Sequence, residues 1–132
     1  MGKTLIIKGA DFSQVAVEKS WVDVTPTIVA GLALNGSTNQ VVENSEWVIY
    51  CIPMEDGMDY HIYEQWSETR FHRLGIATEI PEAGTTVEYI VNQTAVSEAT
   101  YTMDETYHAV SDGYLVWQVR PASLVTCFSK KR

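Results

Sequence analysis

The sequence predicts an all-β fold, built as a two-sheet antiparallel sandwich. Three observations predict it. Apolar and polar residues alternate along short segments, turn-forming residues separate these segments, and few stretches have helical spacing. Successive side chains of a strand point to opposite faces, so alternation over four to eight residues indicates a half-buried strand. Several such strands with turns between them are typical of sandwiches and barrels.

The strands are expected where the alternation is regular, at residues 4–8, 21–24, 87–92 and 115–120. Residues 47–52 (WVIYCI) are apolar throughout. A strand that is covered on both faces has this composition, so we expect segment 47–52 at the centre of a sheet.

Turns are expected at 35–37 (NGS), 55–57 (EDG), 82–84 (EAG) and 112–113 (DG), because these residues accept the backbone angles of tight hairpins. Helix is expected to be confined to one or two short turns. Residues 13–19 could form one with Ser13 as its cap, and residues 102–105 could form another. No linker or repeat interrupts the pattern, so the 132 residues are read as a single domain, 1–132.

The charge of the chain restricts its partners. The formal net charge is -8, and three of the nine positive residues lie at 130–132. Such an acidic body repels phosphate, so neither nucleic acid nor an anionic membrane surface is an expected partner. No apolar segment approaches the roughly 18–20 residues that a membrane-spanning helix needs, so membrane insertion is not expected.

The start of the chain lacks the pattern of a signal peptide, which predicts a cytoplasmic protein at synthesis. Release in a virion, or surface association by a route without a leader, stays open. Cys51 and Cys127 lie in apolar runs and are expected to be buried free thiols. No cofactor or metal site is predicted, since no cysteine or histidine spacing suits a metal.

Catalytic patterns are weak. The chain has no Gly-x-Ser-x-Gly motif, no paired histidine motif and no glycine-rich phosphate loop. Acidic residues gather at Glu55, Asp56, Asp59 and Glu64. They could serve a glycosidase or hold Ca²⁺, but the first three are expected to be solvated residues of a hairpin connection. We therefore expect no enzyme activity, with a small hydrolase as the least favoured alternative.

The segment 63–73 (YEQWSETRFHR) is the best candidate for a ligand site, and we expect it at a hairpin bend. An exposed tryptophan beside arginines and carboxylates suits a sugar, because the ring covers the apolar face and the charged groups bind hydroxyls. The alternative is that Trp66 folds over the core while the charges pair with each other. Trp21, Trp47 and Trp117 are expected in the core. The candidate ligand-binding residues are Tyr63, Glu64, Trp66, Arg70, His72 and Arg73.

The opening residues 3–13 (KTLIIKGADFS) resemble the start of modules in phage and surface proteins of gut anaerobes, which have a galactose-binding-like jelly-roll fold. The later order 22–25, 27–28, 47–53, 57–62 and 112–116 is similar as well. The resemblance implies a two-sheet jelly roll used for glycan binding or virion assembly. Segment 66–73 departs from the family pattern of an apolar strand and a Tyr-Asp turn, so no binding residue is carried over.

Two functions follow as hypotheses. The first is a non-enzymatic module that binds a surface glycan, or a protein partner, for adhesion in a phage or cell-surface assembly. The second is a structural subunit of a virion or surface assembly, such as a fibre or decoration protein, that forms homo-oligomers through strand edges and aromatic patches.

Overall fold

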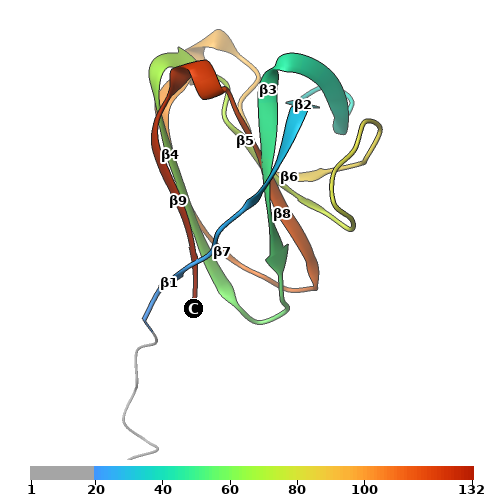
Figure 1. Cartoon of the computed structure of the whole chain (residues 1–132), viewed down its shortest axis with the longest axis vertical. Coiled ribbons are helices and arrows are strands. Elements are labelled where there is room, and N and C mark those ends of the chain that lie inside the picture. Colours follow the sequence, from blue (N-terminus) through green and yellow to red (C-terminus); the bar gives the residue numbers. More distant parts are fainter. Residues whose placement is uncertain (1–19) are drawn as a thin grey trace, which may run out of the picture.

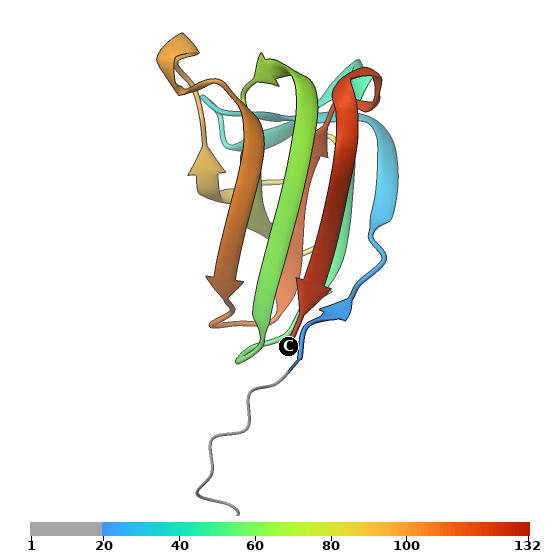
Figure 2. The ribbon, with the colours of Figure 1, turned by 90° about the vertical axis from the view of Figure 1, so that its left-hand side faces the viewer.

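The computed structural model describes residues 20–132, which form two antiparallel sheets packed face to face (Figure 1). One sheet has the order β1-β9-β4-β7 and the other has the order β2-β3-β8-β5-β6. Figure 2 shows the four-stranded sheet in front, with β4 between β7 and β9. The all-β prediction of a two-sheet sandwich is confirmed. The strands are β1 (Val22–Asp23), β2 (Thr27–Asn35), β3 (Gln40–Met54), β4 (Asp59–Arg70), β5 (Arg73–Ala77), β6 (Glu88–Asn92), β7 (Thr100–His108), β8 (Gly113–Val119) and β9 (Leu124–Lys131).

The strand pairs are nested. Apart from β2, the first strand pairs with the last, β3 with β8, β4 with β7 and β5 with β6. This is the order of one long hairpin folded over into two layers, which is the jelly-roll arrangement. The strand β2 is an addition that extends the second sheet by pairing with β3.

Three of the expected hairpins are wrong. Residues 55–58 join β3 to β4, residues 71–72 join β4 to β5, and residues 109–112 join β7 to β8, yet in each case the flanking strands lie in different sheets. Turn-forming residues allow the chain to change direction, but they do not specify which sheet receives it. The turn at 35–37 does close a hairpin between β2 and β3, where the Asn35 side-chain oxygen accepts hydrogen bonds from the backbone amides of Ser37 and Thr38.

The predicted central strand is confirmed in β3, which is covered on both faces. Ile52 and Met54 point between the sheets, where they pack in one cluster with Trp117 of β8. Ile49 and Cys51 point to the other side and pack in a second cluster. That cluster also contains Leu32, Leu34, Val41, Ala77, Val87 and Val116.

The helical turn expected at 102–105 is wrong, because these residues belong to β7. Met103 is buried while Asp104 is exposed, and the strand pairs along β4. Single turns of 3-10 helix occur instead at Val96–Glu98 and Pro121–Ser123. The expected strand 4–8, the expected turn 13–19 and the block 3–13 lie outside the described residues. Within residues 20–132, no helix has the length and apolar character needed to cross a bilayer.

Candidate functional site

The six candidate ligand residues do not form one site. Strand β4 alternates between the core and the outer face of its sheet, and the chain then crosses to the other sheet at 71–72. Three candidates lie in the core, one lies on the outer face of the four-stranded sheet, and two line a groove at the end of the sandwich.

Glu64, Trp66 and His72 are the core group, with 0%, 1% and 0% of their surface exposed. The imidazole of His72 stacks on the Trp66 indole with ring centroids 3.9 Å apart. His72 Nδ1 lies 2.6 Å from Glu64 Oε2, and its Nε2 lies 3.1 Å from the Thr100 carbonyl oxygen. The expectation of an exposed Trp66 is therefore wrong, and the alternative in which it folds into the core is confirmed.

The Glu64–His72 pair holds one shared proton. The Thr100 carbonyl can only accept, so Nε2 of His72 carries a hydrogen. The 2.6 Å contact needs one more proton, either on Nδ1 or on the carboxyl group. Burial raises the pKa of Glu64, while the hydrogen bond and the charge of His72 oppose that rise. With one proton the pair is neutral overall, which lowers the cost of burying it.

Tyr63 lies on the outer face of the four-stranded sheet, half-buried. Its ring stacks on Phe128 of β9 with centroids 5.2 Å apart and planes 16° apart. His61 and Lys130 also pack against the Phe128 ring. These contacts keep Tyr63 away from the other five candidates.

Arg70 and Arg73 line a groove of about 470 Å³. We call it the Arg70 groove. Both aromatic and amide side chains contribute to its wall. The lining includes Leu34, Asn35, Ser37, Asn44, Trp47, Thr69, Phe71 and Gln118. The strands β2 and β3 supply one wall, and the crossing from β4 to β5 supplies the other.

The two arginines of the groove have different roles. Arg73 donates from Nε to the Asn92 side chain, from one terminal nitrogen to the Leu34 carbonyl and from the other to the Gln93 carbonyl. It therefore fixes the groove wall. Arg70 pairs with Glu68 at 3.0 Å through one terminal nitrogen, and its Nε is buried without a hydrogen-bond partner among the described residues. The Arg70 side chain as a whole is 38% exposed, so the guanidinium can meet a ligand in the groove.

Trp47 is the tryptophan of the groove, although the sequence placed it in the core. It is half-buried and packs edge-on against Trp66, with centroids 5.7 Å apart. Trp21 is also half-buried and lies under the Arg132 guanidinium, 4.3 Å from the ring centroid. Trp117 is 1% exposed, as predicted. The polar run 43–46 before Trp47 was the available signal that this residue lies at a rim.

The acidic cluster is divided as well. Glu64 lies in the core, whereas Asp59 bonds His108 at 2.8 Å and Arg132 at 3.5 Å. The pKa of Asp59 is lowered, chiefly by the hydrogen bond from His108 and also by Arg132. Within residues 20–132, no group of three or more histidine, cysteine or acidic side chains is placed to hold a metal ion. The calcium alternative finds no site there.

The cysteines occupy different faces. Cys51 lies in the second cluster and is buried, and its pKa is raised to about 11 because of that burial. Cys127 is half-buried and faces Tyr50 between the sheets. Both are free thiols, as expected, although only Cys51 is fully buried.

Comparison with family models, with curated proteins and with solved structures finds no match to this chain.

Proposed function

We propose that this protein is a non-enzymatic carbohydrate-binding module and that the Arg70 groove holds the sugar. The observation that carries the proposal is the lining of the groove. The aromatic rings of Trp47 and Phe71 line the groove together with the Arg70 guanidinium and the Asn44 amide. Aromatic rings cover the apolar face of a pyranose, and planar polar groups bind its hydroxyls.

The size and charge of the groove favour a small neutral sugar. Its volume of about 470 Å³ falls in the usual range for small-molecule sites. The net charge of -8 disfavours an anionic ligand at long range. The Arg70 side chain is 38% exposed and lines the groove, so its guanidinium can donate to a sugar oxygen there.

A glycan array followed by titration of the best sugar tests the proposal. Arg70→Gln and Phe71→Ala alter the groove, and both side chains are only half-buried, so these variants should fold. We expect each to weaken binding about tenfold, the effect of losing one good contact. Trp66→Ala is unsuitable, because removing a buried indole would destabilise the domain.

Tyr63→Ala is the matched control, since Tyr63 is an aromatic residue of the same segment that lies outside the groove. It should bind as the wild type does. No binding to any sugar at millimolar concentration would reject the glycan function. Loss of binding in Tyr63→Ala alone would move the site to the outer face of the four-stranded sheet.

The second candidate is a structural subunit of a virion or surface assembly. The nine-residue strand β7 is an edge of the four-stranded sheet. Exposed apolar residues lie along it or next to its ends: Tyr101 at 54%, Val96 at 85% and Val110 at 72%. An exposed long edge with apolar side chains favours pairing with another copy. Light scattering tests this candidate: a stable trimer or larger ring, reduced by Tyr101→Lys, supports it, and a strict monomer rejects it.

A further inference from the structure

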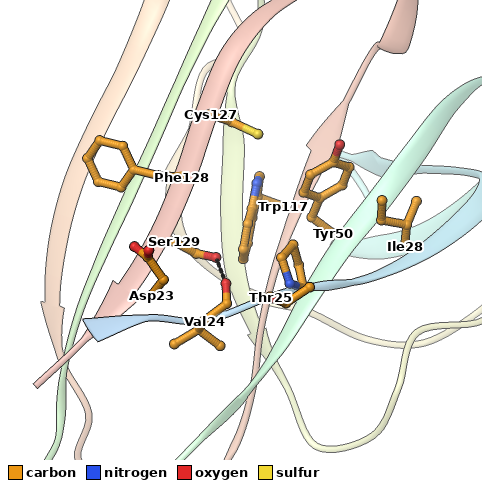
Figure 3. A pocket seen from close by; sticks show the side chains of 10 residues that line it. Asp23, Val24, Thr25, Ile28, Tyr50, Trp117, Cys127, Phe128 and Ser129 are labelled. Carbon is orange, nitrogen blue, oxygen red and sulfur yellow. Dashed lines mark hydrogen bonds between the residues drawn. The ribbon is translucent and has the colours of Figure 1, made fainter. Parts of the chain in front are cut away.

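A second cavity lies between the two sheets, where the chain crosses from β1 to β2. It measures about 400 Å³ and shares no lining residue with the Arg70 groove. Figure 3 shows its side chains, which come from β1, β2, β3, β8, β9 and the β1–β2 connection. Most of the wall is apolar or aromatic. Its main residues are Val24, Pro26, Ile28, Tyr50 and Trp117, whereas the Phe128 ring turns to the outer face of the four-stranded sheet.

Trp117 contributes a polar group that has no protein partner. Its side chain is 1% exposed, and its indole nitrogen finds no hydrogen-bond acceptor among the described residues. In Figure 3 this nitrogen is at the end of the ring nearest to the Cys127 and Tyr50 side chains. A buried donor that is left unpaired costs about 1–3 kcal/mol, so an acceptor in the cavity would be stabilised there.

The other polar groups of the wall are occupied or neutral. Ser129 donates its hydroxyl to the Val24 carbonyl at 2.6 Å. The pKa values of Tyr50 and Cys127 are both raised, chiefly by burial, so hydroxyl and thiol stay protonated at neutral pH. Asp23 is the one charged side chain among the described lining residues, and it is 83% exposed and pairs with Lys130.

We propose that this cavity is a second ligand site, for a small neutral molecule with an apolar body and one hydrogen-bond acceptor, such as a ketone. The Trp117 indole N–H donates a hydrogen bond to that acceptor. The apolar wall binds the body of the ligand by removing it from water. Charged ligands are disfavoured, since the described wall offers no cation for an anion and no unpaired anion inside for a cation.

Nuclear magnetic resonance of the four tryptophan indole N–H groups tests the site in the full chain. The probes are 2-octanone and, as matched controls, protonated 2-aminooctane and octanoate. We expect 2-octanone to shift the Trp117 indole signal in a saturable way, while the ammonium control, which has only donors, leaves it unchanged. Octanoate should bind more weakly than the ketone.

Two variants identify the location. Trp117→Phe removes the N–H, and with it the reporter signal, but keeps an aromatic ring. Measured from the signals of 2-octanone itself, its binding should be weakened about 3- to 10-fold, as expected for one hydrogen bond. Ile28→Glu places a charge at a lining position that is 55% exposed, so this variant should fold and lose binding. Arg70→Gln, which alters only the groove, should bind 2-octanone normally.

Several results would overturn the site. These are a Trp117 signal that 2-octanone does not move, shifts of all four indole signals together without saturation, and equal binding by Ile28→Glu and the wild type. Because the sugar titration uses other residues, either site can fail while the other stands.

Discussion

Replacing His72 with leucine would leave the Glu64 carboxyl group buried without its partner. Both side chains are 0% exposed, and the pair is joined by a 2.6 Å hydrogen bond. Removing one partner of a buried ion pair typically costs about 3–5 kcal/mol. A domain of ordinary stability has a free energy of unfolding of about 5–15 kcal/mol, so His72→Leu would remove a large share of it.

The loss of stability caused by His72→Leu should depend on pH. Burial already raises the pKa of Glu64 above 4.5, and without His72 nothing equivalent opposes that rise. A raised folded-state pKa gives stability that is complete below the unfolded pKa and is lost as pH rises through the folded pKa. Between these two pKa values, the free energy of unfolding of His72→Leu should therefore fall by up to about 1.4 kcal/mol for each pH unit. The reference for this comparison is a variant that has neither Glu64 nor His72.

Urea denaturation at pH 5 and pH 8 measures the effect, with tryptophan fluorescence and circular dichroism as the signals. The comparison variants are Glu64→Leu and the double variant Glu64→Leu/His72→Leu. Glu64→Leu should cost less, about 1–3 kcal/mol, because a neutral imidazole is easier to bury than a carboxylate. The double variant should regain most of the loss, since an apolar pair fills a similar volume.

The reasoning would be refuted if His72→Leu and the double variant were equally unstable at pH 8. It would also be refuted if the stability of His72→Leu relative to the double variant were the same at both pH values.

Three further predictions follow from single residues. Arg73→Lys should destabilise by about 2–3 kcal/mol in a denaturation experiment, because one ammonium cannot reproduce three directed hydrogen bonds to the Asn92 side chain and two carbonyls; a loss below half a kcal/mol would contradict this. Gly75→Ala should cost about 1–3 kcal/mol by thermal melting, since the new Cβ would lie 2.3 Å from Val87 Cγ1 and 2.8 Å from a backbone oxygen; an unchanged melting temperature would show that the strand moves freely there. Cys51, with a pKa of about 11, should not react with a disulfide reagent at pH 8 until the protein is unfolded, and rapid labelling of the native protein would disprove its burial.

Strand positions followed from local residue chemistry, because the period of two reports directly which side chains face a core. The segments 87–92 and 115–120 were correctly predicted in this way and became β6 and β8. The uniformly apolar run 47–52 also revealed that β3 is covered on both sides. The 102–105 segment was misread, since its short polar sequence allows a helical turn and only pairing with β4 fixes it as a strand.

The candidate site was predicted only in part. The arginines of segment 63–73 do reach the Arg70 groove, but Trp66 and His72 point into the core. Segment 63–73 lies on β4 and its crossing into β5, so its side chains alternate between opposite faces instead of gathering on one bend. Trp47 comes from a distant strand, and no local pattern indicates that β3 and the β4–β5 crossing share a wall.

By itself, the sequence determined the all-β class, the acidic charge and the strand period, because each of these depends on residues that are neighbours in the chain. Only the tertiary structure decided the nested strand order, the Glu64–His72 pair and the two cavities. Those features join residues far apart in the chain, and the free energy that brings them together is released only when the two sheets close over a common core.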